Sequence, residues 1–435
     1  YSGLAELLNS KILNKLLDCS TAAYGISKQK HPVGKNENFQ VCQSEISKPN
    51  LVSDVGLAEA FSKQMEDKAR YCFDERVWYL WNGNNWEKDT QRKILQLEIN
   101  FIKEAINWSS INGYPEIGTK LSNYLSSSKL ENLEKVAQSN LPVRADEFDV
   151  HDMQLCVKNG VLNLQNGCLI AADPNLFHRK NTNVIFDENA QCPTFRQFLS
   201  SIFQDDKEIL EYIQKVAGYM LTGNTREQCL FMFLGGGANG KSTLVNVLSK
   251  VLGDYSVNAA ANTLMASNNN SLGDDLIRLA GARLITVAET EYGQRFAEAK
   301  IKSITGGDKI TGRPLYGNWI EFKPVGKIVL STNTRPEIRG SDDGIWRRVK
   351  EVPFECHFSE EKQDRELAKK LHKEISGILN WALEGCLKWQ EEGWGRMKAT
   401  ASVNELEWDT AIWFDKKQDT YLLPIKAEIR KKGKL

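Results

Sequence analysis

The chain has no net charge, no clustered cysteines and no long apolar run. Its 56 Lys and Arg residues equal its 56 Asp and Glu residues, so nucleic-acid binding would have to come from local patches. Nine cysteines are scattered without any C-x-x-C spacing, which argues against a zinc site and predicts reduced, intracellular thiols. Because no apolar run reaches the ~18 residues of a membrane helix and no signal peptide is present, we expect no membrane partner.

What is present describes a globular protein with a substantial core. Hydrophobic residues make up 41% and charged residues 26% of the 435 residues, a length that allows two to four domains. The first residue is Tyr1 rather than Met. We therefore expect a fragment or a processed chain, with a further domain missing upstream.

The stretch 230–251 carries the most specific pattern. An apolar run of strand length, Leu230 to Leu234, precedes G-x-x-x-x-G-K-S, and a helical pattern follows. Glycines let successive backbone N–H groups point at phosphate oxygens, and the helix N-terminus favours the same anion. The residues expected to hold a nucleoside triphosphate, here ATP, are Gly235, Gly236, Gly237, Ala238, Asn239, Gly240, Lys241, Ser242 and Thr243.

Within this loop the side chains predict separate tasks. Lys241 reaches the β- and γ-phosphates, the Ser242 hydroxyl takes a Mg²⁺ position, and Thr243 adds a phosphate contact. A chance match in an ordinary glycine-rich turn is the alternative. The strand before the loop and the helix after it argue against that alternative.

Polar residues also end two later apolar runs. Glu289 directly follows the run 283–288, and Glu291 comes two residues later. A carboxylate at a strand tip beside a phosphate loop can hold the Mg²⁺ hydration shell or polarise the attacking water, and Glu289 is the stronger candidate. Asn333 follows the run 327–332 and is predicted to bond the γ-phosphate or the water, although Asn also begins turns.

The segment 296–322, between these two runs, predicts a helix ending at Gly306–Gly307 and then two short strands. From Lys300 to Lys350 there are eleven Lys and Arg against five Asp and Glu. This local excess makes a DNA contact possible through backbone phosphates and a stacked base. The candidates are Lys302, Lys309, Arg313 and Tyr316. A solvated hairpin with salt-bridged ends is an equally good interpretation.

Arg347 and Arg348 form a pair after a polar loop. They are either surface charge or an arginine finger that reaches the γ-phosphate bound by a neighbouring subunit. A finger acting in this way requires an oligomer.

The remaining chain predicts supporting structure. A helical pattern covers 57–73, an aromatic hairpin 77–86, helices 91–140, a small meander 154–170 and two helices 194–223. The aromatic residues of the hairpin can stack on bases, but cross-strand packing is the likelier interpretation. The predicted domains are a linker or tail at 1–50, an N-terminal domain at 51–190, a helical collar at 191–225, the motor at 226–358, a C-terminal helical segment at 359–410 and a basic tail at 411–435.

Taken in order, these motifs resemble the superfamily 3 helicases, and more narrowly the phage/plasmid and poxvirus-type primase-helicase family. The resemblance covers roughly 57–409. It is carried by GGGANGKST, RLITVAETE, IKSITGGDKITGRPLY, KIVLSTNTRP and GIWRRVKEVPF, preceded by VKNGVLNLQNG and AGYMLTG. In several relatives two acids are adjacent in the second motif, whereas here Thr290 separates Glu289 from Glu291.

The resemblance implies an α/β fold: an AAA+-like P-loop NTPase domain with a central parallel sheet, preceded by a mostly helical α+β helicase-associated domain. It also implies a homo-hexameric ring in the host-cell cytoplasm that hydrolyses ATP with Mg²⁺ and moves 3′-to-5′ on single-stranded or forked DNA. Family members often carry a primase or primase-polymerase domain upstream.

Two other functions remain open. One is a P-loop ATPase acting as a DNA-packaging motor or an origin-loading switch without unwinding. The other is a nucleotide-gated scaffold that barely hydrolyses, against which the strand-tip acid and the paired arginines argue. A small-molecule kinase is disfavoured, because it needs a lid and an acceptor pocket.

Overall fold

The computed structural model describes residues 53–266, 276–288, 294–312, 320–338 and 343–394, and the backbone of 396–403, 406–415 and 420–422. These residues divide into two compact units. The first contains 53–82 and Trp86–Glu147, and the second contains Gly83–Asn85 and the chain from Phe148 onward. Each unit has its own hydrophobic core.

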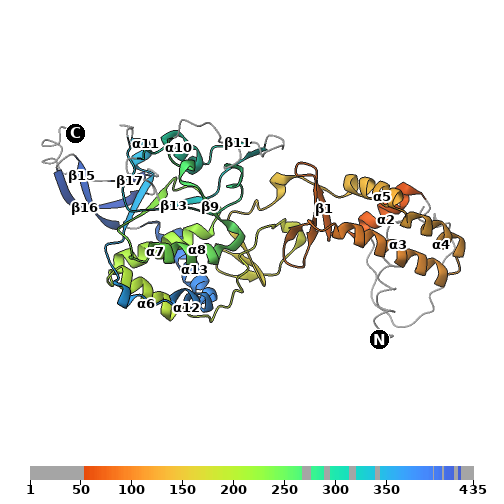
Figure 1. Ribbon diagram of the computed structural model, residues 1–435, viewed down its shortest axis with the longest axis horizontal. Helices are drawn as coiled ribbons and strands as arrows, with labels where there is room; N and C mark the ends of the chain where they lie inside the picture. The colour runs from red at the N-terminus through yellow and green to blue at the C-terminus, as the bar shows by residue number, and fades with distance from the viewer. Residues whose placement is uncertain are drawn as a thin grey trace, which may run out of the picture. The chain divides into compact units, whose positions relative to one another are not determined.

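The first unit combines four helices with a small sheet (Figure 1). Its sheet has the order β3-β2-β1-β4, in which β4 runs parallel to β1 and the other pairs are antiparallel. Helices α2 and α3 meet in the core through the edge-to-face rings of Phe61 and Phe101, 5.5 Å apart. Its elements are α2 (Asp54–Gln64), β1 (Ala69–Cys72), β2 (Val77–Trp81), β3 (Trp86–Lys88), α3 (Lys93–Ile111), α4 (Pro115–Ser122), α5 (Ser127–Asn140) and β4 (Pro142–Val143).

The sequence patterns of this unit are mostly confirmed. The helices within 91–140 and the aromatic hairpin are present. The helix predicted over 57–73 is wrong at its end, because α2 stops at Gln64 and Ala69–Cys72 pairs with β2 as a strand. Trp78, Tyr79 and Trp86 are each buried, which favours packing over base stacking for the hairpin.

Glu98 on α3 is a buried carboxyl group without a hydrogen-bond partner among the described residues. Its side chain has no exposed surface, and both oxygens lack a donor. Burial, together with the smaller effect of the nearby Glu134 charge, raises the pKa of Glu98 to about 8. The unfolded chain therefore releases this proton at lower pH than the folded chain. The stability of the unit must fall as pH rises from the usual value of about 4.3 towards 8.

We expect the free energy of unfolding of this unit to drop by on the order of 3 kcal/mol between pH 5.5 and 8.5. Glu98→Met should remove most of that slope, because methionine fills similar space without an ionisable group. Urea unfolding of the whole chain at the two pH values measures the effect. Glu104→Met, at an exposed position of the same helix, is the matched control. Equal pH slopes for wild type and Glu98→Met would contradict the prediction.

A five-stranded, fully parallel sheet forms the centre of the second unit. Its strand order is β14-β8-β13-β10-β9, and every neighbouring pair is parallel. Parallel strands need crossover connections, which here bring helices onto both faces. The sheet and its crossovers comprise β8 (Leu230–Leu234), α8 (Lys241–Leu252), β9 (Ser256–Ala259), β10 (Leu284–Ala288), α10 (Glu298–Gly306), β11 (Ile310–Gly312), β12 (Ile320–Phe322), β13 (Lys327–Thr332), α11 (Asp343–Trp346) and β14 (Val349–Pro353).

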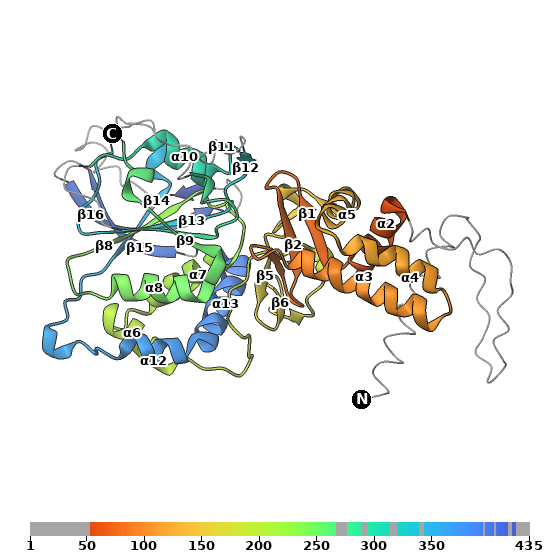
Figure 2. The same cartoon turned by 45° about the vertical axis from the view of Figure 1, so that its right-hand side comes forward.

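Alternate residues of the strands face two different cores. On β8, Phe231 and Phe233 join the cluster formed with α8 and with three further helices, α6 (Pro193–Ile202), α7 (Lys207–Leu221) and α13 (Ile375–Glu392). Leu230 and Met232 instead join the cluster formed with α10 and α11. Figure 2 shows the sheet nearly edge-on, with α7, α8 and α13 on one side and α10 on the other. This layered arrangement confirms the predicted α/β fold with a central parallel sheet and a mostly helical preceding part.

Further helices and a meander complete the second unit. The meander β5-β6-β7 is antiparallel, as predicted. The remaining elements are β5 (Gln154–Val157), β6 (Gly160–Asn163), β7 (Leu169–Ile170), α6 (Pro193–Ile202), α7 (Lys207–Leu221), α12 (Leu367–Lys373), α13 (Ile375–Glu392), β15 (Arg396–Val403), β16 (Leu406–Asp415) and β17 (Thr420–Leu422). No helix in the described ranges is both long and apolar enough to span a membrane.

Two predicted domain limits differ from this grouping. Residues 148–190 were assigned with the N-terminal domain, but Leu155, Cys156 and Leu162 pack in the core of the second unit. The helical segment predicted to 410 ends at Glu392, and residues 396–403 pair with 406–413 as antiparallel strands. The tail predicted from 411 accordingly includes the end of β16 and β17.

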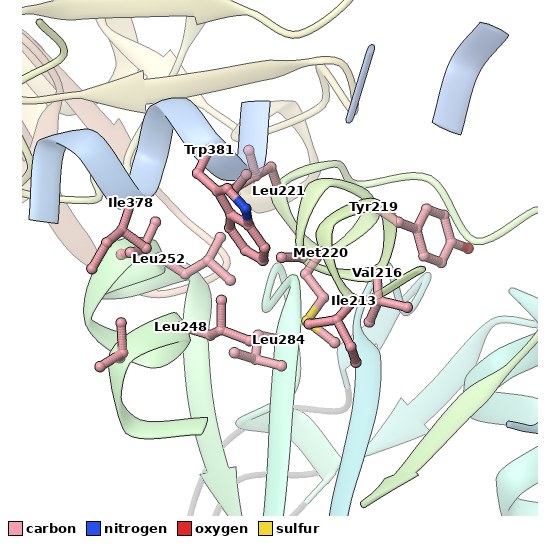
Figure 3. Packing of buried hydrophobic residues seen from close by; sticks show 14 of the residues in the cluster. Ile213, Val216, Tyr219, Met220, Leu221, Leu248, Leu252, Leu284, Ile378 and Trp381 are labelled. Atoms are coloured by element: carbon pink, nitrogen blue, oxygen red, sulfur yellow. The ribbon is translucent and has the colours of Figure 1, made fainter. Parts of the chain in front are cut away.

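Helices α7 and α13 come close enough for their backbones to touch, and Figure 3 shows side chains of both, such as Met220 and Trp381, in one hydrophobic cluster. A Cβ placed on Gly218 of α7 would lie 2.0 Å from the backbone nitrogen of Cys386. A Cβ on Gly385 of α13 would lie 1.9 Å from the carbonyl oxygen of Gln214. Glycine is therefore required at both positions, since a real Cβ does not come this near to backbone.

Gly218→Ala should destabilise the second unit by about 3 kcal/mol or more, because backbone atoms cannot move aside as a flexible side chain does. Thermal unfolding monitored by circular dichroism measures the loss. Gly236→Ala is the matched control, since a Cβ there meets no atom within 4 Å. If both variants melted alike, the close helix contact would not hold.

Candidate nucleotide site

The predicted phosphate loop connects β8 to α8 in a conformation that needs its glycines. Gly240 has φ +86° and a Cβ there would lie 2.7 Å from Cγ2 of Ile202. Ala238 also has positive φ, +55°, which is a strained conformation for a residue with a Cβ. Strand β8 begins and ends where the apolar run does, Leu230 to Leu234. The strand, loop and helix predicted for 230–251 are confirmed.

Lys241 lies inside this loop rather than in solvent. Its Nζ donates to the carbonyl oxygens of Gly235 (2.6 Å) and Gly236 (2.8 Å) and to Oδ1 of Asn239 (3.1 Å). The residue is 6% exposed, and burial lowers the pKa of its amine. The positive charge is therefore concentrated at the centre of the loop, where a phosphate group would be attracted most strongly.

The N-terminus of α8 opens onto the same loop. The residue that caps this 12-residue helix is Gly240, which has no side chain to accept hydrogen bonds from the first-turn N–H groups. Ser242 is exposed in that turn and Thr243 is half-buried. The uncapped N–H groups, the Lys241 amine and the two hydroxyls fit a phosphate chain with its Mg²⁺.

Asn333 meets the loop from the tip of β13. Its Oδ1 accepts a hydrogen bond from Lys241 Nζ at 3.3 Å. The tip is ordered by Thr332, whose Oγ1 accepts from the N–H of Thr334 (3.2 Å) and donates to its carbonyl (2.7 Å). The structure thus brings together two predicted site residues that are 92 positions apart in sequence.

Glu289 and Glu291 lie outside the described residues. The strand that precedes them, β10, is described, and Ala288 at its end is in register with Ser331 of β13. On the other side of β13, Thr332 is in register with Leu234, the last residue before the loop. The carboxyl ends of β8, β13 and β10 therefore form one edge of the sheet. The roles of both glutamates stay predictions.

The chain after β14 also reaches the loop, which the sequence patterns did not indicate. The N–H of Phe358 donates to the carbonyl of Ala238 (2.8 Å), and Nδ1 of His357 lies 3.1 Å from the carbonyl oxygen of Gly237. Nδ2 of Asn239 donates to the carbonyl of Phe354 (3.2 Å). These contacts join residues about 120 positions apart, and no local sequence motif predicts a contact over that separation.

The two candidate finger residues lie at the opposite edge of the sheet. The N–H of Leu230, at the start of β8, donates to the carbonyl of Arg348 (2.8 Å). The five residues of β8 lie between this hydrogen bond and the loop, and they span roughly 17 Å at 3.3 Å per residue. An arginine side chain from this edge cannot reach a nucleotide on its own loop. Within one subunit, neither arginine belongs to this site.

Arg347 and Arg348 differ in how far their side chains are buried. Arg348 is buried, and its guanidinium donates to Thr305 Oγ1 (3.1 Å), the carbonyl of Gly344 and Gln228 Oε1 (3.4 Å). Arg347 is exposed and donates to Gln228 Oε1 at 2.9 Å. Arg348 is thus bound within its own fold, whereas Arg347 presents its charge outward.

The predicted hairpin is formed by β11 and β12, which pair antiparallel. Lys309 at its start makes an exposed ion pair with Glu321 at 2.8 Å, which is what a solvated hairpin with salt-bridged ends predicts. Lys302 is half-buried on α10. Arg313 and Tyr316, at the tip, lie outside the described residues. The strands β11 and β12 form a two-stranded sheet that is separate from the five-stranded sheet carrying Lys241's loop.

Three family profiles match successive parts of the chain. One described as "D5 N terminal like" matches residues 58–204. A "Family of unknown function (DUF5906)" matches 233–348, which contains the phosphate loop and both arginines. A "Domain of unknown function (DUF1905)" matches 366–435.

Viral proteins are among the relatives of known sequence. The chain is 33% identical to "Putative helicase L207/L206" of Acanthamoeba polyphaga mimivirus over 233 residues, which are 52% of this chain and 24% of that protein. It is 30% identical to "Putative helicase 022R" of Frog virus 3 (isolate Goorha) over 167 residues, 37% of this chain and 17% of that protein. With "Uncoating factor OPG117" of Vaccinia virus (strain Western Reserve) it shares 24% identity over 297 residues, 65% of this chain and 36% of that protein. The chain thus matches only about a sixth to a third of each relative.

A solved structure with a partial likeness is the apo C-terminal region of NrS-1 (305–718). It has a TM-score of 0.45 and 12% identity, over 72% of this chain and 65% of that one.

Proposed function

Because the chain belongs to the D5-type primase-helicase family, we propose that it is the ATP-hydrolysing motor of a viral DNA helicase. One observation carries the proposal: Lys241 of the phosphate loop and Asn333 of the β13 tip are joined by a 3.3 Å hydrogen bond. This contact puts a phosphate-binding cation and a polar strand-tip group at one point of the sheet edge. The names of the viral relatives support a helicase over other P-loop ATPases.

In this proposal the residues of the site have separate roles in binding and hydrolysing ATP. The N–H groups from Gly235 to Thr243 and the Lys241 amine hold the phosphates of ATP. Ser242 and Glu289 would hold Mg²⁺, which supplies charge neutralisation at the phosphates when bound. Glu289, or Glu291, orients the attacking water. Asn333 contacts the γ-phosphate and, through Lys241, links that contact to the loop.

A second copy of the chain completes the site in this proposal. Arg347 begins roughly 17 Å from its own loop along β8, so it can act only on the nucleotide of a neighbour. The adjacent Trp346 is 56% exposed, and an exposed tryptophan beside an arginine is a common composition at the centre of protein interfaces. We take the assembly to be a homo-hexameric ring.

DNA is the other partner in this proposal. Lys302, Lys309, Arg313 and Tyr316 would face a single strand in the ring, which moves 3′-to-5′ along it in the direction that the family resemblance implies. The Lys309–Glu321 ion pair is exposed and contributes little to stability, so a DNA phosphate can replace the carboxylate. A primase or primase-polymerase domain joined upstream is a further expected partner.

Two assays test the function together. Steady-state ATP hydrolysis should rise when single-stranded DNA is added. Strand separation should occur on a forked duplex with a free 3′ tail and not on one with only a 5′ tail. Hydrolysis without strand separation would replace the helicase by a packaging motor or an origin-loading switch. An absence of hydrolysis with nucleotide still bound would favour a nucleotide-gated scaffold.

A further inference from the structure

Every carbonyl oxygen from Gly235 to Ala238 accepts a hydrogen bond. Lys241 Nζ donates to the first two, at 2.6 and 2.8 Å, and Asn239 Nδ2 also donates to Gly236 (2.6 Å). The carbonyls of Gly237 and Ala238 receive their bonds from the segment Phe354–Phe358, through His357 and the Phe358 N–H. Half of the loop is therefore held by residues outside the phosphate-loop motif.

The direction of these carbonyls decides the direction of the N–H groups. In a trans peptide the C=O of one residue and the N–H of the next lie in one plane and point opposite ways. Holding the Gly237 carbonyl outward turns the Ala238 N–H inward, and holding the Ala238 carbonyl does the same for Asn239. These inward N–H groups are the ones that a phosphate-binding loop uses. The positive φ of Ala238 (+55°) is a strained state that such bonds can maintain.

His357 is the side chain that bonds the Gly237 carbonyl oxygen. A carbonyl oxygen only accepts, so Nδ1 of His357 must carry a proton to bond Gly237 at 3.1 Å. The imidazole is otherwise exposed and has no place in the hydrophobic core. Gly235 allows the segment to come near, because a Cβ there would lie 2.3 Å from the Phe354 carbonyl oxygen.

We propose that His357 is a positioning residue for the nucleotide site, which acts by holding the Gly237 carbonyl so that the loop's N–H groups face the phosphates. The inference rests on the proposed function, since it assumes that a nucleotide binds at this loop. It adds a residue that lies beyond the phosphate-loop motif, the strand-tip residues and the arginine pair. His357 itself touches the loop and not the phosphates.

Titration of the whole chain with a fluorescent ADP analogue and Mg²⁺ tests the inference. His357→Ala should weaken binding about three- to tenfold, the size of one net hydrogen bond. It should raise the KM for ATP by the same factor with kcat within about twofold. His357→Asn should restore most of the affinity, because the Asn side-chain NH₂ can take the place of Nδ1–H. His372→Ala, at an exposed histidine of α12, is the matched control and should bind as wild type does.

The melting temperatures of all three variants should stay unchanged, since both histidines are exposed. Wild-type affinity in His357→Ala, or no recovery in His357→Asn, would overturn the inference. Lys241→Ala in the same titration distinguishes an error in the role of His357 from an error in the nucleotide site itself. If Lys241→Ala loses binding while His357→Ala does not, only the role of His357 is wrong. If Lys241→Ala binds as tightly as wild type, the nucleotide site itself is wrong, and the inference falls with it.

Discussion

Lys241→Ala should lower ATP hydrolysis by at least roughly a hundredfold while leaving the fold intact. The amine is the one charge placed at the centre of the loop, held by the carbonyls of Gly235 and Gly236. Removing a preorganised group aimed at developing charge typically costs 10²–10³ in rate. A coupled assay of phosphate release measures turnover, and circular dichroism with thermal unfolding measures the fold.

A neighbouring lysine gives the control for this result. Lys250 lies on the same helix α8, in its last turn, so Lys250→Ala removes an equal charge far from the loop. It should hydrolyse ATP at the wild-type rate. Turnover retained in Lys241→Ala would refute the site. Loss of turnover in both variants would instead point to a general requirement for the charge of α8.

Arg347→Ala should abolish hydrolysis without lowering the stability of the protein, whereas Arg348→Ala should lower the stability without abolishing hydrolysis. An arginine finger is worth 10³–10⁵ in rate, and Arg347 is the exposed member of the pair. Arg348 is buried and bonded to Thr305 and Gly344. Its loss should cost about 1–3 kcal/mol of stability, because it leaves buried acceptors unpaired. Turnover and thermal unfolding of both variants decide between them.

Mixing two inactive variants tests whether the finger acts between subunits. In a mixed oligomer, a subunit carrying Arg347→Ala still has Lys241, and a neighbour carrying Lys241→Ala still has Arg347. Some interfaces then contain both groups, and part of the activity should return. No recovery from the mixture, in a preparation shown by light scattering to be oligomeric, would mean that Arg347 does not act across subunits.

Local patterns were sufficient for the centre of the site. The strand, glycine turn and helix around Lys241 are consecutive in sequence, and a polar residue at the end of an apolar run predicts Asn333, because parallel strands end at one edge. By contrast, the short edge strand β9 was not predicted. Its four residues, Ser256–Ala259, include a polar Asn258 and no buried position, so the apolar run that indicates an inner strand is missing.

The features that the sequence could not predict depend on contacts between distant residues. Arg347 and Arg348 are adjacent and chemically identical, and only the packing of Thr305 and Gln228 shows which one is buried. The bond of His357 to Gly237 joins the end of one strand to the loop after another. The C-terminal helical segment predicted from 359 is broken at Glu374, whose carboxylate accepts from the N–H groups of Thr194 and Phe195 at 3.0 Å each.

The contact between α7 and α13 also sets where the chain can be shortened. Gly218 and Gly385 let the two backbones come together, and Trp381 of α13 packs beside Met220 and Leu221 of α7 in the shared core (Figure 3). A fragment that stopped at residue 358, after the last strand of the sheet, would keep the phosphate loop but leave that side of the core open to water. A piece able to fold around the loop must therefore include α13 and also Trp394 beyond it, whose ring lies 5.5 Å from that of Tyr219 on α7. The helix α13 thus belongs to the folded second unit as much as the strands of the sheet do.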